Sequence, residues 1–344
     1  MKKSLVALAV LAASGASFAQ SNVTLYGIAD IWLGSMKAER AAVGPNYFGH
    51  VNAAGTSVTT TRMDSGGVNG SRWGVKGSED LGGGLSAIFK LEQGFSLDSG
   101  AATVGQAFSR QAYVGFAGGF GEVQLGKVWT AFDDVWGASN AVFDSALSPT
   151  HHVFQSINYI DRTSNGLRYS TPTFGGFAGA VSYSLDEKVP GAAKVSAFSV
   201  TYGAGPVAAH LGYQVEDIQN TGALPSDLKY LIVGGSYNFG VATAKANYAQ
   251  VKNLGNANGA DTKEYQLGVD FPISSALTVS ASYAKSDDNA TAGNQSRKGY
   301  GIGATYTLSK RTFLYGGYNA NKASNAGAGD DKLDILAVGV QHKF

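Results

Sequence analysis

The chain has 344 residues, with 26 basic and 25 acidic side chains, 47 glycines and no cysteine. Its near-neutral charge gives no electrostatic reason to expect nucleic acid as a partner, and the lack of cysteine excludes disulfides. Abundant Gly, 17 Tyr and 17 Phe with only 15% charged residues disfavour disorder and helical bundles and favour long β-structure with many tight turns.

Residues 1–19 have the features of a secretory signal peptide. Lys2 and Lys3 precede an apolar run over residues 5–13, and Ser17 and Ala19 are small residues suited to a cleavage site. We expect cleavage after Ala19 and one mature domain over residues 20–344, with 24 basic and 25 acidic residues. No later apolar run reaches the 18 or so residues that a membrane helix needs.

Many segments alternate between apolar and polar residues with a period of two, which predicts β-strands. In residues 207–216, for example, Leu211 and Tyr213 share one face, whereas His210 and Gln214 share the other. The pattern recurs at 85–92, 177–186, 265–271, 277–283 and 300–308. A soluble sandwich would show the same alternation, so this feature alone does not decide the fold.

The connections are more informative than the strands. Seven short turns occur at 80–84, 118–121, 173–176, 203–206, 238–240, 272–276 and 309–311. Longer polar stretches lie between them, at roughly 34–70, 94–108, 129–161, 186–195, 216–227, 250–262, 286–298 and 320–332. Seven tight turns join fourteen strands, and a strand at each terminus makes sixteen. Short connections at one end and long ones at the other predict a closed outer-membrane barrel without edge strands.

Aromatic residues flank the short turns, where an interfacial girdle is expected. They are Phe120, Phe174, Phe177, Phe239 and Phe271. The alternative is aromatic packing in a soluble all-β core, which would have to bury some sixteen half-apolar strands without a Leu-rich interior. The last strand alternates and stops on Phe344, an ending for which general folding principles offer no reason.

Several stretches resemble the general porins of Gram-negative outer membranes, in particular those of β-proteobacteria. These stretches span the mature chain in order: VTLYG (23–27), SRWGVKGSEDLGGGL (71–85), RQAYVGF (110–116), FGEV (120–123), RYSTPTFGGF (168–177), SKRTFLY (309–315) and VGVQHKF (338–344). The resemblance implies an all-β, sixteen-stranded antiparallel transmembrane barrel, normally a homotrimer among outer-membrane lipid and lipopolysaccharide. It also implies passive diffusion of ions and small hydrophilic solutes, and recognition of Phe344 by the barrel-assembly machinery.

The resemblance also implies a constriction, formed by a third long loop (129–161) that folds into the lumen. Arg72, Arg110 and Arg162 match the family's wall arginines, and Arg168 shares their face if its strand is regular. The acidic candidates on the loop are Asp133, Asp134 and Asp144. The loop has no Pro-Glu-Phe-Gly-like stretch, so its path and the aspartate that lines the pore stay open.

Physical arguments support the same site. The loop is much longer than usual and too apolar for a solvated tail, so it should pack on the inner wall. An arginine on the lipid face near the midplane costs roughly 2–4 kcal/mol, which favours an inward position for Arg72. Opposed charges across a narrow water-filled gap sort ions, and three or four arginines against three aspartates favour anions weakly.

Three other functions have less support in the sequence than the general porin. A substrate-specific channel for a sugar or an organic anion would need an aromatic rail on the lumen face, but most strand aromatics fall on the apolar face. An enzyme is not expected, because none of the five histidines lies in a nucleophile motif. Neither His151–His152 nor Asp330–Asp331 predicts a metal site, and no cofactor is expected. A plugged, non-channel barrel is the remaining alternative.

Overall fold

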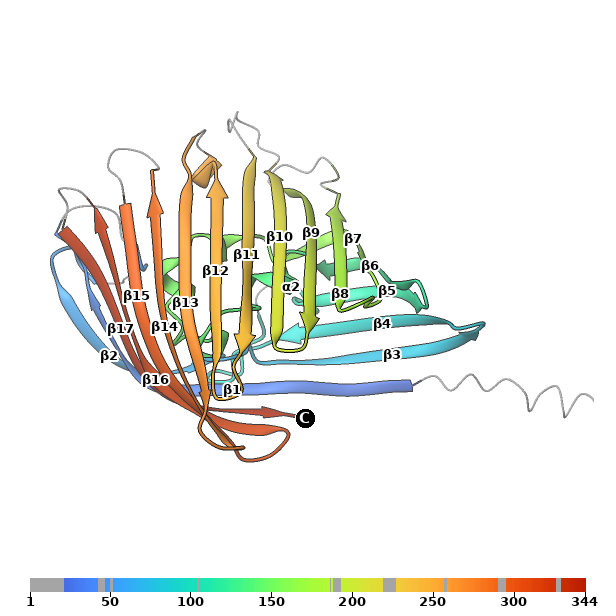
Figure 1. Cartoon of the computed structure of the whole chain (residues 1–344), viewed down its shortest axis with the longest axis horizontal. Coiled ribbons are helices and arrows are strands. Elements are labelled where there is room, and N and C mark those ends of the chain that lie inside the picture. The colour runs from blue at the N-terminus through green and yellow to red at the C-terminus, as the bar shows by residue number, and fades with distance from the viewer. Residues whose placement is uncertain are drawn as a thin grey trace, which may run out of the picture.

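Every strand that the structure describes belongs to one antiparallel sheet that closes into a barrel (Figure 1). The computed structural model describes residues 22–42, 47–49, 52–103, 105–185, 187, 193–218, 227–256, 259–289, 295–325 and 329–344. The predicted signal peptide lies outside these residues. Closure is made by the first and last strands, which pair from Ile28↔Lys343 to Glu39↔Lys332. The described residues contain no helix that combines the length and hydrophobicity needed to cross a bilayer.

The elements follow in chain order. The strands are β1 (Asn22–Glu39), β2 (Ser57–Ser65), β3 (Arg72–Gly82), β4 (Leu85–Gly94), β5 (Gln111–Gly118), β6 (Gly121–Trp129), β7 (Arg162–Ser170), β8 (Phe177–Ser184), β9 (Ala193–Ala204), β10 (Val207–Ile218), β11 (Leu228–Asn238), β12 (Thr243–Lys252), β13 (Thr262–Pro272), β14 (Leu277–Asp288), β15 (Gln295–Thr307), β16 (Thr312–Asn325) and β17 (Gly329–Lys343). The helical turns are α2 (Asp133–Trp136), η1 (Val142–Asp144), α3 (Thr150–Val153), η2 (Ser156–Asn158) and η3 (Leu254–Asn256).

The sixteen expected strand positions are filled by seventeen segments, because one position is interrupted. β2 pairs with the second half of β1, and β3 pairs with the first half. The two segments therefore lie end to end along β1. Residues 66–71, here called the inner turn, separate them. The long loop expected over 34–70 is therefore wrong in extent: it contains the end of β1 and all of β2. Gly66 allows the break because it adopts a φ of 81°, which favours glycine.

All seven predicted tight turns are confirmed as hairpin connections, from β3–β4 to β15–β16. In Figure 1 they lie at the end of the barrel that carries the chain's C-terminus, and the long connections lie at the other. Several long connections are shorter than expected because the strands continue into them. β16 and β17, for example, leave only residues 326–328 between them, where a loop over 320–332 was expected.

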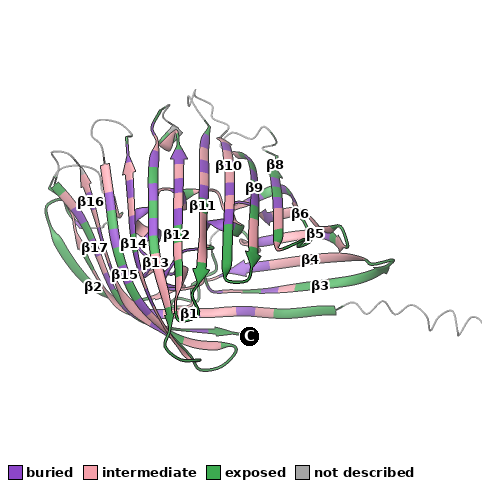
Figure 2. Ribbon diagram, viewed as in Figure 1, coloured by how far each residue is buried: buried purple, intermediate pink, exposed green. Residues whose placement is uncertain are grey.

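The barrel is apolar outside and polar inside. Exposed and buried residues alternate along β9 to β15 (Figure 2), and the exposed ones include Leu267 and Ile302. The buried ones include Gln214, Glu264 and Gln266, each at most 1% exposed. All five girdle phenylalanines are exposed, between 43% and 87%. A soluble core would invert this arrangement, whereas lipid outside and water inside require it.

The C-terminal residue closes the barrel against Gly27. The two residues exchange backbone hydrogen bonds, from Gly27 N to Phe344 O at 3.0 Å and from Phe344 N to Gly27 O at 3.1 Å. A Cβ at position 27 would lie 2.2 Å from Phe344 Cζ and 2.8 Å from the backbone oxygen of Arg72. Glycine is therefore required at this position by close approach.

We expect Gly27→Ala to destabilise barrel closure by about 1–3 kcal/mol, the usual range for an overpacked site. Gly203→Ala is the matched control, because a Cβ at Gly203 would meet nothing within 4 Å. The samples are incubated at rising temperatures before detergent gel electrophoresis. The measurement is the incubation temperature at which the folded, fast-migrating band disappears. Equal temperatures for the two variants would contradict the role assigned to Gly27.

Candidate pore constriction

The third long connection, residues 130–161, folds inside the barrel and is called the lumen loop below. Its α2 contacts β9 and β10, and its α3 contacts β14 to β16. Phe132, Val135, Trp136 and Phe154 are buried in one cluster with wall residues of β11 and β12, such as Ile232. Figure 1 shows α2 behind the wall formed by β9 to β11. The apolar side chains that made this loop unsuitable as a solvated tail therefore attach it to the inner wall.

Polar side chains of the wall accept hydrogen bonds from backbone N–H groups of the loop. The N–H of Ile160 donates to Glu216 Oε1 at 2.6 Å, and the N–H of Ser156 donates to Glu264 Oε2 at 3.1 Å. The N–H of Ala131 donates to Ser182 Oγ at 2.9 Å. Backbone groups buried without partners would each cost free energy, so these contacts fix the loop's path across the lumen.

Arg168 holds the root of the lumen loop. Its Nη2 lies 2.6 Å from Asp134 Oδ2, and its Nη1 donates to the carbonyl oxygen of Thr130 at 3.0 Å. β7 is irregular between Arg162 and Arg168, with a register shift against β6 and a φ of 53° at Asn165. The condition of a regular strand, on which Arg168 was grouped with Arg162, is therefore not met. Arg168 and Asp134 form an anchor at the loop's root.

Two of the other three predicted arginines, Arg110 and Arg162, stack on Trp129 at the end of β6. The guanidinium carbon of Arg162 lies 3.6 Å from the centroid of the indole ring, and that of Arg110 lies 5.4 Å away. Arg72 and Arg162 are both close enough to Arg110 for their charges to repel. Stacking of a guanidinium on an indole contributes about 0.5–2 kcal/mol, which helps hold these like charges together.

Glu92 offsets this repulsion, and the sequence did not single it out. Its side chain is buried on β4. Glu92 Oε1 accepts from Arg110 Nε at 2.8 Å, and Oε2 accepts from the Tyr26 hydroxyl at 2.8 Å. The nearest nitrogens of Lys90 and Arg72 lie 3.5 and 3.9 Å from Oε2. Its polar position in the alternating stretch 85–92 was the available signal, because alternation places it on the lumen face.

Asp133 faces the basic cluster from the lumen loop. Its charge acts on both Arg72 and Arg162, and its Oδ1 accepts a 2.5 Å hydrogen bond from the Tyr159 hydroxyl. Asp161, a second residue that the sequence analysis missed, lies 2.9 Å from Arg162 Nη1. Its position next to Arg162 could have drawn attention to it. The structure thus opposes three arginines and Lys90 to Glu92, Asp133 and Asp161.

Asp144 lies elsewhere, at the tip of the lumen loop. Its Oδ1 lies 2.8 Å from His151 Nε2 and accepts from Asn140 Nδ2 at 2.7 Å. His152 Nε2 lies 2.8 Å from the carbonyl oxygen of Ala146, so the two histidines serve different partners. Asp331 bonds to the backbone N–H groups of Ala41 and Tyr47. Within the described residues, no three His, Asp or Glu side chains form a group that could hold a metal.

The inner turn supports the tip of the lumen loop from the opposite wall. The carboxylate of Asp30, fully buried on β1, accepts from the backbone N–H groups of Gly67, Val68 and Asn69 at 2.9–3.2 Å. The Tyr315 hydroxyl donates to the same carboxylate at 2.6 Å. The carbonyl oxygen of Gly67 in turn accepts from the N–H of Ala146 in the lumen loop at 2.7 Å. One buried carboxylate therefore organises the segment that holds the loop.

Comparisons with known proteins agree with this architecture. A family model described as Gram-negative porin matches residues 4–326. Outer membrane porin protein 32 of Delftia acidovorans is 35% identical, over 99% of this chain and 95% of its own length. The major outer membrane protein P.IB of Neisseria meningitidis is 30% identical over the full length of both chains.

Solved structures show the same fold. The anion-selective porin from Comamonas acidovorans superposes with a TM-score of 0.75 at 28% identity, over 94% of this chain and all of its own. The family model covers most of the chain, the relatives extend over nearly all of it, and the barrel places lipid-facing residues outside and polar residues inside. The chain belongs to the Gram-negative porin family, the channel proteins of the outer membrane.

Proposed function

We propose that the chain forms a water-filled channel through which ions and small hydrophilic solutes diffuse passively, with a preference for anions. The observation that carries the proposal is the convergence of Arg72, Arg110 and Arg162 on one wall beside the lumen loop. Fixed charges at a narrow aqueous passage select ions by sign. No catalytic role is part of the proposal.

The acidic groups of the lumen loop are largely engaged, which favours the anionic sign. Asp134 is paired with Arg168, and Asp144 is bonded to His151 and Asn140. Among the wall groups, Glu92 is buried beneath the arginines that it bonds. Positive charge is therefore left to face the passage. The related porin from Comamonas acidovorans is described as anion-selective, which agrees with this sign.

The zero-current potential across a planar bilayer in a salt gradient tests the proposal. We expect a potential of the sign produced by anions crossing faster than cations. The alternative is a channel specific for a sugar or an organic anion. Saturable block of the chloride current by one solute of either class would favour that alternative, because a general channel has no site to saturate.

We expect the anion preference to be stronger at pH 5 than at pH 8. Burial raises the pKa of Asp133 to about 7, and the charges of Asp161 and Asp134 act in the same direction. Below that pH the carboxyl is neutral, so the passage loses one negative charge opposite Arg72 and Arg162. Above it the carboxylate is charged and attracts cations. The measurement is the zero-current potential as a function of pH.

Asp133→Asn is the control for this pH dependence, because an amide keeps the shape and does not titrate. The variant should show the low-pH potential at both pH values. A variant that retains the full pH dependence would assign the titration to another group. Tyr159 bonds to the same carboxylate, so a Tyr159→Phe variant should move the midpoint upward.

We also propose that the mature chain begins at Gln20 and assembles as a homotrimer in outer-membrane lipid, with Phe344 read by the assembly machinery. N-terminal sequencing of the outer-membrane form tests the first point. Cross-linking in the membrane tests the second. Deletion of Phe344, with the folded fraction in the outer membrane as readout, tests the third.

A further inference from the structure

Just before its tip, the lumen loop crosses the inner wall in residues 139–142, called the crossbar below. All four residues are at most 3% exposed, so their polar groups depend on the wall for partners. Ser139 Oγ lies 3.3 Å from His210 Nδ1 of β10. Asn140 Oδ1 accepts from Asn247 Nδ2 of β12 at 2.8 Å. The crossbar thus begins against β10 and continues against β12.

Ala141 and Val142 extend the crossbar over the next two strands. A Cβ at Gly268 of β13 would lie 2.2 Å from Ala141 Cβ, so the glycine leaves the space that Ala141 fills. The N–H of Val142 donates to Ser280 Oγ of β14 at 2.7 Å. Because β10 to β14 are neighbours in the sheet, the crossbar runs across the strands and meets them in order.

Lys245 of β12 and Asp270 of β13 connect the contacts made by Asn140 and Val142. Lys245 Nζ donates to the carbonyl oxygen of Asn140 at 3.3 Å and lies 2.7 Å from Asp270 Oδ2. Asp270 Oδ1 accepts from Ser280 Oγ at 2.5 Å, and the same Oγ accepts from the N–H of Val142. The chain of contacts therefore leaves the crossbar at Asn140 and returns to it at Val142.

The directions of these hydrogen bonds depend on the charged pair. A serine hydroxyl has one hydrogen, and because Asp270 accepts it, the lone pairs of Ser280 Oγ are free to face the N–H of Val142. Lys245 offsets the charge of Asp270 and still has a hydrogen for the Asn140 carbonyl. Hydrogen bonds to ionised groups are roughly twice as strong as neutral ones. The pair therefore fixes both sides of Ala141.

The crossbar adjoins the strained part of the lumen loop. Val142 is the first of three residues with a left-handed φ, and Asp144 is the last. Asn140 Nδ2 donates to Asp144 Oδ1 at 2.7 Å, so the two ends of this part are joined. The side chain of Asp144 is partly exposed in the lumen and also bonds to His151 of α3. A shift of the crossbar would therefore move the tip and α3 together.

We propose that Lys245 and Asp270 are positioning residues of the passage. They hold the crossbar, and through Asn140 they keep the lumen loop in a single position while solutes pass. The proposal rests on the channel function proposed above. It is independent of ion selectivity, because the pair carries no net charge.

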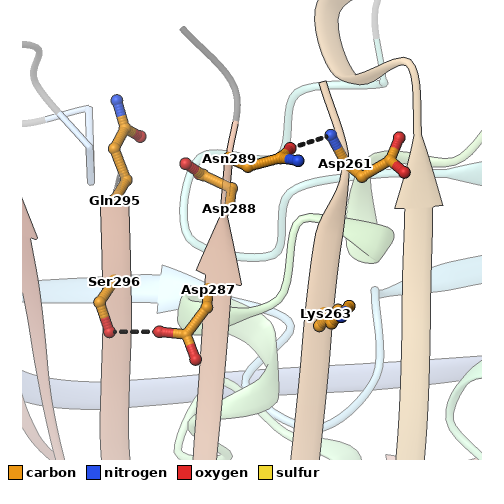
Figure 3. Close-up of a pocket in the computed structure, with 7 residues that line it drawn as sticks. All are labelled: Asp261, Lys263, Asp287, Asp288, Asn289, Gln295 and Ser296. Atoms are coloured by element: carbon orange, nitrogen blue, oxygen red, sulfur yellow. Dashed lines mark hydrogen bonds between the residues drawn. The ribbon is translucent and has the colours of Figure 1, made fainter. Parts of the chain in front are cut away.

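The outer face of the barrel has the same arrangement of side chains without a loop against it. Lys285 Nζ lies 2.6 Å from Asp287 Oδ2, and Ser296 Oγ donates to Asp287 Oδ1 at 2.7 Å. Figure 3 shows this bond between Ser296 of β15 and Asp287 of β14. The neighbours of Asp287 along the strand, Ser286 and Asp288, are buried on the lumen side, so Asp287 faces outward. The outer group is therefore a matched control.

Single-channel recording of Lys245→Met/Asp270→Asn, called the neutral variant, tests the proposal. The variant removes the pair and keeps the net charge. Loss of a hydrogen bond to a charged group typically shifts an equilibrium by about tenfold to a hundredfold, so the fraction of open time spent in sublevels should rise at least about tenfold. Lys285→Met/Asp287→Asn should behave as wild type. Equal behaviour of the two double variants would overturn the proposal.

Exchange of the two charges separates a positioning role from a simple ion pair. Lys245→Asp/Asp270→Lys keeps opposite charges on β12 and β13. The exchanged carboxylate has no hydrogen for the Asn140 carbonyl, and the exchanged ammonium cannot accept from Ser280. We expect sublevels as frequent as in the neutral variant. A channel as quiet as wild type would show that the ion pair alone suffices and that the residues do not position the loop.

A steric variant tests the crossbar without altering a charge, and it applies even if the pair variants do not fold. Gly268→Ala places a Cβ against Ala141 and should produce sublevels. Gly268→Ala/Ala141→Gly removes the opposing Cβ and should return the channel most of the way to wild-type behaviour. If the second substitution does not reduce the sublevels, the crossbar does not lie against Gly268.

Two further measurements separate this proposal from the proposed function. Hydrogen exchange of residues 139–142, read by mass spectrometry, needs no current and should be about tenfold faster in the neutral variant than in wild type. The zero-current potential of the neutral variant should equal that of wild type. Unchanged exchange would overturn the positioning role. A wild type without anion preference, with exchange as expected, would affect the proposed function alone.

Discussion

An Arg72→Gln/Arg162→Gln variant is expected to lose its anion preference and conduct cations at least as well as anions. Above pH 7, where Asp133 is charged, the double substitution leaves Arg110 and Lys90 opposed by Glu92, Asp133 and Asp161, so the local charge changes sign. A unit charge about 5 Å from a passing ion contributes roughly 0.8 kcal/mol at the dielectric constant of water. Because the anion and the cation are affected in opposite directions, removal of two such charges should change the permeability ratio at least about tenfold. The zero-current potential in a salt gradient measures this change.

A charge-matched control separates the constriction from the protein's net charge. Lys310→Gln/Arg311→Gln removes two positive charges from an exposed turn between β15 and β16, outside the lumen. Its potential should equal that of wild type. If the arginine variant also kept the wild-type potential, Arg72 and Arg162 would have no part in selecting ions.

Arg110 is left unchanged in this experiment for a structural reason. Its Nε is 2.8 Å from Glu92 Oε1, the tightest ion pair of the cluster. Loss of one partner of a buried pair leaves the other charge uncompensated, which typically costs about 3–5 kcal/mol. An Arg110 variant would therefore combine a change in selectivity with a loss of stability, and the two effects could not be separated.

Most of the barrel could be predicted from the sequence because its rules are local. Alternation with a period of two places Leu211 outside and Gln214 inside, and each tight turn is encoded in a few adjacent residues. The interruption between β2 and β3 could not be predicted in this way. It depends on Asp30, which bonds to residues more than thirty positions away.

The constriction was predictable only in part. Arg72, Arg110 and Arg162 were found through the family resemblance, and the structure brings them together. The partners of the loop aspartates were not predictable, because they depend on the path of the loop across the lumen. Asp134, for example, meets Arg168 after a separation of 34 residues, and only the folded loop brings them to 2.6 Å.

Asp30→Ala is expected to lower the stability of the barrel by about 4 kcal/mol and to increase the noise of the channel current. The substitution removes the acceptor of three backbone N–H groups of the inner turn and of the Tyr315 hydroxyl. A buried donor left without a partner costs about 1–3 kcal/mol. Water entering from the lumen keeps the cost of each of the four donors near the low end of this range. The unfolding temperature in detergent and single-channel recordings measure the two effects.

Two matched variants complete this experiment. Tyr315→Phe removes one of the four hydrogen bonds and should cost about 1 kcal/mol, without added noise. Asp64→Ala removes an ion pair within β2, the strand next to β1, where Arg62 Nε lies 2.5 Å from Asp64 Oδ2. This variant should cost at most about 1 kcal/mol because the pair is partly exposed.

The expected noise follows from strain at the tip of the lumen loop. Val142, Phe143 and Asp144 have φ values of 57°, 64° and 48°, a left-handed conformation that costs roughly 1–3 kcal/mol per non-glycine residue. The tip keeps this conformation only while two hydrogen bonds anchor it. The N–H of Val142 donates to Ser280 Oγ at 2.7 Å, and the N–H of Ala146 donates to Gly67 O at 2.7 Å. Without Asp30 the second anchor loses its support, so the tip should relax and move across the passage. A quiet channel in a destabilised Asp30→Ala barrel would show that Gly67 does not hold the loop.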